Sequence, residues 1–115
     1  MVSVTIWHNP RCSKSRTALK LLEDAGLEIT TRRYLEAAPS LAEIRAAKAA
    51  LGLTAIEMMR PGEALFSELG LSKSDDEATL LAAMAAHPRL IERPIVFRGT
   101  RAVIGRPPEA VLTLL

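Results

Sequence analysis

The sequence has a single cysteine, few aromatic residues and no long apolar run, and each shortage excludes a class of protein. One cysteine cannot form an internal disulfide, which fits a reducing compartment such as the cytoplasm. With one Cys and two His, a structural zinc site is not expected. The longest apolar stretch, residues 78–86, is far shorter than the roughly 20 residues that cross a bilayer, so we expect no membrane association. The first residues also lack the pattern of a signal peptide.

The remaining composition indicates a globular protein. Of the 115 residues, 49% are hydrophobic and 24% are charged, and we expect one domain over residues 1–115. Because only 3% are aromatic, aliphatic side chains and alanine must fill most of the core. A formal charge of +2 is too small to predict nucleic-acid binding, which needs a dense basic face.

The spacing of apolar residues predicts an α/β order along the chain. Residues 2–7 alternate between apolar and polar side chains, as in a strand, and helical spacing follows from Ser13 until Gly26. β-Branched residues then predict a second strand over residues 29–35. A strand, a helix and a second strand in this order predict a parallel βαβ unit.

Pairs of capping-box form predict a helical middle segment. They are Ser40 with Glu43, Thr54 with Glu57 and Ser74 with Glu77. The helices that we expect lie near residues 41–51, 55–59 and 76–86, with a further short turn over residues 63–69.

The last part of the chain returns to β structure. Residues 94–98 and 101–105 flank a Gly-Thr pair that is suited to a tight hairpin. A pair of prolines at Pro107 and Pro108 then starts a last helix to Leu115, since proline fits the first turn of a helix. The whole order is βαβ, a helical block and ββα.

Cys12 lies between the first strand and the first helix, where the unpaired N–H groups of a helix start favour negative charge. A free thiol has a pKa of about 8.5, and such a position lowers it. The hydroxyls of Ser13 and Ser15 are candidate donors to a thiolate or to a bound oxyanion. We therefore predict that Cys12 is a nucleophile. The alternative for a lone cysteine is a buried, inert side chain.

Basic side chains surround this cysteine in the sequence. His8 precedes it, and Arg11 and Arg16 flank it. As an imidazolium, His8 would favour the thiolate electrostatically, and we predict this role ahead of direct proton transfer. The alternative is a solvated or capping histidine.

The residues around Cys12 do not match the motifs of two other classes of cysteine enzyme, the cysteine phosphatases and the dithiol oxidoreductases. Cysteine phosphatases need a Cys-x5-Arg loop, and this chain has Ala18 in place of the arginine. The form from Cys12 to Ser15 is C-x-x-S, which lacks the resolving cysteine of a dithiol oxidoreductase. Any chemistry at Cys12 therefore proceeds without a second thiol from this chain.

The motif HNPRCSKSR, residues 8–16, resembles the active-site loop of the glutaredoxin-coupled arsenate reductase family. Later segments match the same family in the same order: Leu35-Glu36, Arg60, ERPIV at residues 92–96 and IGRPPE at residues 104–109. The resemblance spans essentially the whole chain. It implies an α/β, thioredoxin-like fold, in which a four-stranded mixed sheet carries a helical insertion between the N-terminal βαβ and C-terminal ββα units.

The resemblance also implies a site. Arg60, Arg93 and Arg106 resemble the oxyanion-binding arginines of the family, and arginine offers a charged, planar fork to pairs of oxygens. The predicted site is thus Cys12 and His8 as catalytic residues, with Ser13, Ser15, Arg60, Arg93 and Arg106 as substrate contacts. Arg93-Pro94 resembles the cis-proline segment of thioredoxin folds, while residues 61–64 depart from the best-studied reductase pattern.

The activity that the family implies is the reduction of arsenate to arsenite in the cytoplasm. Cys12 would attack the arsenic of bound arsenate, glutathione would supply the second thiol, and a glutaredoxin would remove the mixed disulfide. We expect no bound cofactor and no metal, with glutathione as a co-substrate. No nucleic acid and no membrane are expected as partners.

The sequence leaves two alternatives open. Related Spx-type regulators share the fold and an RPI-like segment but bind RNA polymerase; many carry a Cys-x-x-Cys switch, which Ser15 breaks here. The second alternative is a monothiol, glutathione-linked oxidoreductase with another substrate.

Overall fold

The computed structural model describes residues 2–115, and their contacts divide them into two compact units. One unit comprises the described residues up to Ala37 together with Arg93–Leu115, and the other is Ala38–Glu92. Whether these two units form the single domain expected over residues 1–115 is not tested by this division, so that expectation stays a prediction.

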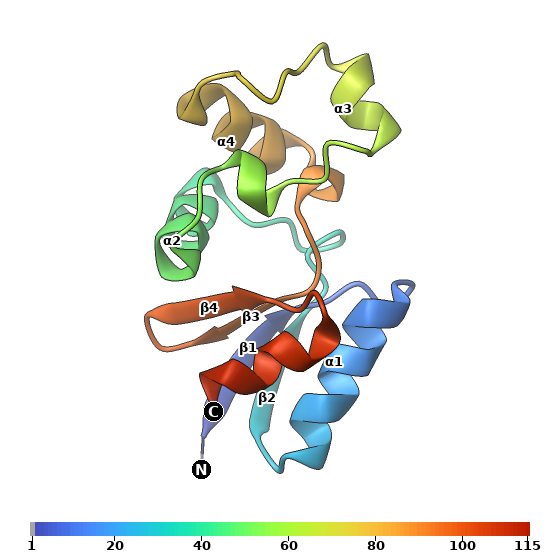
Figure 1. Cartoon of the computed structure of the whole chain (residues 1–115), viewed down its shortest axis with the longest axis vertical. Coiled ribbons are helices and arrows are strands. Elements are labelled where there is room, and N and C mark those ends of the chain that lie inside the picture. Colours follow the sequence, from blue (N-terminus) through green and yellow to red (C-terminus); the bar gives the residue numbers. More distant parts are fainter. Residues whose placement is uncertain (1) are drawn as a thin grey trace. The chain divides into compact units, whose positions relative to one another are not determined.

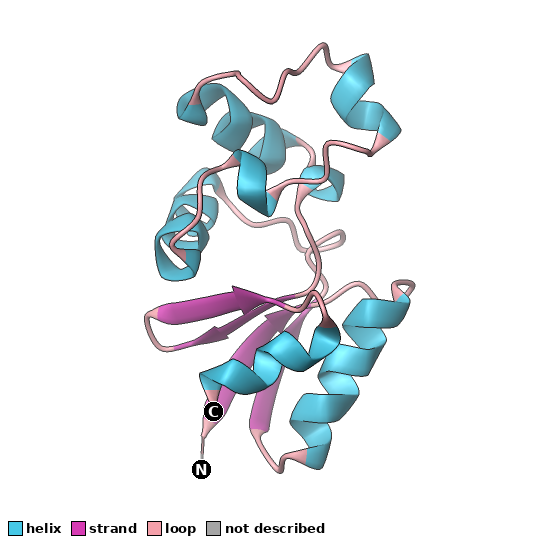
Figure 2. Cartoon of the chain, viewed as in Figure 1, coloured by secondary structure: helices cyan, strands magenta, loops and turns pink. Residues whose placement is uncertain are grey.

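The first unit contains a four-stranded mixed sheet, drawn in magenta in Figure 2. Its strands are β1 (Ser3–Trp7), β2 (Glu28–Arg32), β3 (Ile95–Arg98) and β4 (Arg101–Ile104). They lie in the order β2-β1-β3-β4, with β1 and β2 parallel and the other two pairs antiparallel. The predicted βαβ unit and the hairpin around Gly99 are both confirmed.

Two helices, α1 (Ser13–Asp24) and the 3-10 helix η3 (Pro108–Leu114), lie side by side on one face of this sheet (Figure 1). The core between them and the sheet consists of Val4, Ile6, Ala18, Leu22, Val96, Val111 and Leu114. Ala18 and Leu22 are one helical turn apart, so both point inward from α1. Complete burial of a leucine side chain contributes about 1.5–3 kcal/mol, which holds α1 against the sheet.

The second unit is helical, as the middle of the sequence predicted. Its elements are α2 (Leu41–Leu51), η1 (Ile56–Met58), α3 (Ala64–Glu68), α4 (Glu77–Ala86) and η2 (Pro88–Leu90). Of the three capping boxes, only the first forms completely: the Ser40 hydroxyl accepts from the Glu43 N–H, and the Glu43 carboxylate accepts from the Ser40 N–H.

The box predicted at Ser74 is wrong, because Asp76 caps α4 instead. The Asp76 carboxylate accepts from the N–H of Thr79 at 2.7 Å, while the Ser74 hydroxyl bonds to that of Ser72 at 2.9 Å. Two overlapping cap signals compete here, and an aspartate is as good an N-cap as a serine.

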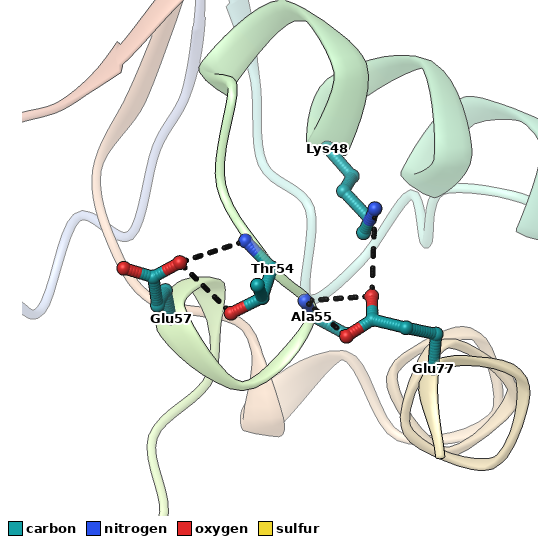
Figure 3. Close-up of polar contacts among 5 residues, drawn as sticks. All are labelled: Lys48, Thr54, Ala55, Glu57 and Glu77. Carbon is teal, nitrogen blue, oxygen red and sulfur yellow. Dashed lines mark hydrogen bonds and ion pairs between the residues drawn. The ribbon is translucent and has the colours of Figure 1, made fainter.

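Glu77 is freed from that box and joins three segments of the second unit (Figure 3). Its carboxylate oxygens accept from the N–H of Ala55 at 3.0 and 3.3 Å, and one of them lies 3.4 Å from Nζ of Lys48 on α2. The Thr54 box forms in one direction only: Glu57 accepts from both the N–H and the hydroxyl of Thr54.

No helix among residues 2–115 is both long enough and apolar enough to cross a bilayer.

Candidate active site

Cys12 is the N-cap residue of α1. Its backbone is extended (φ −95°, ψ 122°), its N–H donates to the carbonyl of Asn9 at 3.0 Å, and its carbonyl accepts from Arg16 at 3.0 Å. The thiol makes no capping hydrogen bond and is partly exposed. The inert, buried cysteine considered from the sequence is therefore not what the fold contains.

The surroundings of Cys12 favour its thiolate. Partial burial raises the pKa of the Cys12 thiol, but the backbone N–H of Ser15, the charge of Arg93 and the N–H of Lys14 together lower that pKa below its ordinary value. The N–H groups belong to the first turn of α1, where no carboxylate competes for them. The Cys12 thiolate is therefore stabilised both by the start of α1, as the sequence predicts, and by the guanidinium of Arg93 from a distant part of the chain.

This balance predicts the pH dependence of alkylation. A lowered pKa keeps the thiolate at a lower pH, so the rate of Cys12 alkylation by iodoacetamide should rise with a midpoint below that of an ordinary cysteine thiol. The Arg93→Gln variant should move this midpoint upward, because it removes a charge that stabilises the thiolate. An unchanged midpoint in that variant contradicts the assignment. Arg98→Gln, a change of the same kind on β3, is the control.

Ser15 connects the loop to His8 instead of facing outward. Its hydroxyl oxygen is fully buried, accepts from the N–H of Asn9 at 3.0 Å and lies 2.6 Å from Nδ1 of His8. The hydroxyl is thereby occupied inside the loop, so Ser15 acts on Cys12 through its backbone N–H and not through the side chain predicted as a donor. Ser13, the first residue of α1, is exposed.

His8 differs from the expected imidazolium. Burial lowers the pKa of His8, and the positive charges of Arg33 and Arg16 lower it further, while Glu23 opposes them. His8 is 6% exposed, and burial disfavours the charged imidazolium. We infer that His8 positions the loop through Ser15 and does not supply a positive charge.

Residues from the far end of the chain reach the same place. Arg106 directs Nη2 at Sγ of Cys12, at 4.0 Å, and its Nε donates to the carbonyl of Arg93 at 2.9 Å. The Gly105 N–H donates to the carbonyl of Pro94 at 2.9 Å, and the Arg93–Pro94 and Arg106–Pro107 peptide bonds are both cis. The fold therefore brings Cys12, Arg93 and Arg106 together, as the resemblance implied for these three residues.

Comparison with known proteins agrees with this arrangement. The profile of the ArsC family matches residues 7–114. The chain belongs to the ArsC family. It is 44% identical to a Neisseria meningitidis protein named arsenate reductase, with both chains covered completely. It is also 46% identical to the uncharacterized protein YfgD of Escherichia coli, over 97% of this chain and 96% of that one.

Solved structures give the fold of this ArsC-family chain. The structure titled arsenate reductase from Vibrio cholerae is 48% identical, covers 99% of this chain and 98% of its own, and superposes with a TM-score of 0.95. A structure titled putative arsenate reductase from Yersinia pestis is 46% identical, covers 96% of this chain and 98% of its own, and superposes with a TM-score of 0.90. The predicted fold class, an α/β thioredoxin-like fold with a helical insertion, is confirmed.

Arg60 lies in the second unit of this ArsC-family chain, so its membership of the site stays a prediction. Its Nη1 pairs with Oε2 of Glu63 at 3.2 Å and donates to the carbonyl of Arg89 at 3.4 Å. The other oxygen of Glu63 pairs with Arg89 at 2.9 Å. One carboxylate thus holds two guanidiniums. Glu63 was not predicted from the sequence, because Arg60 lies before α3 and Glu63 is the N-cap of that helix, so no helical spacing connects the two residues.

Gly105 is a second residue whose role was missed. A Cβ added there would lie 2.8 Å from Cγ of Pro94 and 3.1 Å from Cγ1 of Val111. Glycine therefore lets the segment before Arg106 approach the segment after Arg93. The IGRPPE segment contains Gly105, but only the fold shows which residues it approaches.

Gly105→Ala should accordingly be destabilising. Overpacking a tight contact costs about 1–3 kcal/mol, and we expect a decrease of that size in the free energy of unfolding, measured by urea denaturation. Gly62→Ala is the matched control, because a Cβ at Gly62 meets no atom within 4 Å. Equal stabilities of the two variants would show that Pro94 and Val111 make room at no cost.

Within residues 2–115, no group of three His, Cys, Asp or Glu side chains is arranged to hold a metal ion.

Proposed function

We propose that this chain reduces arsenate to arsenite, with Cys12 as the nucleophile. The observation that carries the proposal is a partly exposed thiol with a lowered pKa, at the start of α1 and 4.0 Å from the guanidinium of Arg106. The relatives named arsenate reductase, at 44% identity over their full length, support the choice of oxyanion.

In the first step, the Cys12 thiolate attacks the arsenic of bound arsenate. A sulfur–arsenic bond forms and one oxygen leaves as water after protonation. Charge develops on the remaining oxygens, and preformed donors at that place lower the barrier. In this proposal, Arg93 and Arg106 supply such donors, together with the first-turn N–H groups of α1. Ser13 and Arg60 belong to the proposed substrate contacts on sequence grounds.

In the second step, the thiolate of glutathione attacks Sγ of Cys12. The sulfur–arsenic bond breaks with its electron pair on arsenic, which is reduced from As(V) to As(III) and leaves as arsenite. The two sulfurs are oxidised to a mixed disulfide. A glutaredoxin thiolate then attacks the glutathione sulfur and releases Cys12. These thiol steps need a reducing compartment, so a cytoplasmic location is part of the proposal.

The test is arsenite formation from arsenate by the purified chain with glutathione and glutaredoxin, with each component omitted in turn. Omission of either thiol component should stop multiple turnover. Phosphate and sulfate should act as weak competitors, since both are tetrahedral oxyanions. If no donor system gives arsenite, the proposal is wrong.

A monothiol oxidoreductase that acts on a different substrate is the second candidate, because a lone thiol with a lowered pKa serves disulfide exchange as well. It predicts efficient reduction of hydroxyethyl disulfide by glutathione without any response to arsenate. A comparison of kcat/KM for the two substrates separates the candidates.

A further inference from the structure

Three basic residues surround Cys12 without acidic counterparts. Arg11 precedes the cysteine, and Lys14 and Arg16 lie in the first turn of α1; the side chains of all three are exposed. We call these three residues the basic rim. Glu23 is the first acidic residue of the whole chain, so the loop and the first half of α1 carry no negative side chain.

Two other cations of this unit do have acidic counterparts. Lys20, farther along α1, pairs with Asp24 at 3.5 Å, and Arg33 lies 4.0 Å from Glu36. Within residues 2–115, by contrast, no carboxylate lies within 4.0 Å of a rim cation. Arg16 donates to the carbonyl of Pro10 at 2.9 Å, which holds its guanidinium over the loop and leaves the charge uncompensated.

The positive field of the rim acts beyond the loop. Burial, the charge of Arg33 and the charge of the rim residue Arg16 all lower the pKa of His8, while Glu23 raises it. Arg93 and Arg106 add positive charge on the other side of the thiol. A reactant that approaches Sγ therefore passes several positively charged side chains, which steer anions and repel cations.

We propose that the basic rim selects an anionic low-molecular-weight thiol as the second reactant at Cys12. The inference rests on the proposed function, in which a second thiol must come from outside because the chain has one cysteine. Glutathione has this chemistry: it carries two carboxylates and one ammonium, so its net charge at neutral pH is negative. Its carboxylates are the groups that arginine and lysine side chains at the rim recognise.

The step that the rim accelerates is thiol–disulfide exchange, which can be measured without arsenate. The Cys12 thiolate attacks one sulfur of a disulfide, a new S–S bond forms to Cys12, and the other half leaves as a thiolate. Cys12 is oxidised and the leaving half is reduced, so no further reagent is needed.

The experiment compares three disulfides of different charge: oxidised glutathione, which is anionic, hydroxyethyl disulfide, which is neutral, and cystamine, which is cationic. The rate of Cys12 modification is followed by mass spectrometry at low and at high ionic strength. Each rate is divided by the rate at which the same disulfide reacts with free cysteine. In the unmodified chain at low salt, this relative rate should be highest for the anionic disulfide, intermediate for the neutral one and lowest for the cationic one. At about 1 M salt the screening length falls to about 3 Å, and the differences should shrink.

The test variant is the double substitution Arg11→Gln and Lys14→Gln, because neither side chain makes a hydrogen bond or ion pair among the described residues. The ratio of the oxidised-glutathione rate to the hydroxyethyl-disulfide rate should fall about five-fold at low salt, as two charges at about 10 Å from the reactant would give. Because both rates depend on the same Cys12 thiolate, a change in its pKa or reactivity affects both and cancels in their ratio. Lys20→Gln is the control: it removes one positive charge from α1 outside the rim, and its ratio should not change.

Each outcome has a single meaning. An equal ratio in the double variant and the unmodified chain overturns the rim proposal, and so does a cystamine rate as fast as that of oxidised glutathione. If the charge preference holds while no donor system yields arsenite, the proposed function fails and the rim stands. If arsenite forms without any charge preference, the rim fails and the proposed function stands.

Discussion

Replacement of Cys12 by serine should abolish arsenite production, a decrease of at least about 10³-fold in kcat/KM. The reason is electronic as well as kinetic. In the proposed cycle, arsenic gains two electrons when the Cys12 sulfur joins a disulfide, and an oxygen atom cannot take that role. The hydroxyl also stays protonated where the thiol ionises, because the environment that lowers the pKa of Cys12 cannot bring an alcohol into the neutral range. Arsenite release measured with glutathione and glutaredoxin checks the prediction.

The same substitution provides its own folding control. Cys12 is an N-cap residue without a capping hydrogen bond, and serine is among the best N-caps. Cys12→Ser should therefore be at least as stable as the unmodified chain, by up to about 1 kcal/mol in the free energy of unfolding. Loss of activity with stability retained attributes the defect to the sulfur. Arsenite production that survives the substitution would remove Cys12 from the mechanism.

The local features of this protein could be predicted from the sequence because they depend on neighbouring residues. The start of α1 at Ser13, the capping box of Ser40 and Glu43, and the hairpin around Gly99 all follow from short-range rules. The second strand was predicted too long, to Leu35, but it ends at Arg32. The chain turns there, with the N–H of Glu36 bonded to the carbonyl of Arg33 at 3.0 Å.

The electrostatics of the site could not be predicted in the same way. His8 looked like an imidazolium beside a thiol, yet its protonation depends on burial and on Arg33, which follows the second strand. Arg93 and Arg106 reach Cys12 only because β3 pairs with β1 and Gly105 packs on Pro94. Their role came from the resemblance to a family, since no local pattern connects residues so far apart in the sequence.

Arg106→Lys should lower kcat/KM for arsenate by about 10- to 100-fold, although the charge is conserved. Two contacts depend on the shape of the guanidinium: Nη2 points at Sγ of Cys12 at 4.0 Å while Nε donates to the carbonyl of Arg93 at 2.9 Å. A lysine ammonium occupies one point and cannot satisfy both. The variant should lose the hydrogen bond to the carbonyl of Arg93 and the paired hydrogen bonds of a guanidinium to the oxyanion.

Steady-state kinetics with arsenate as the varied substrate check this prediction, and Arg101→Lys is the control. Arg101 lies on β4, is exposed and donates to the carbonyl of Thr113 at 3.2 Å, so it shares the unit and the chemistry but not the position beside Cys12. The control should keep its activity within about two-fold, as exposed substitutions usually change little. If Arg106→Lys matched this control, positive charge alone would suffice at the thiol and the forked geometry would be irrelevant. If both variants lost activity equally, the defect would lie in the fold around the hairpin and not in the contact with Sγ.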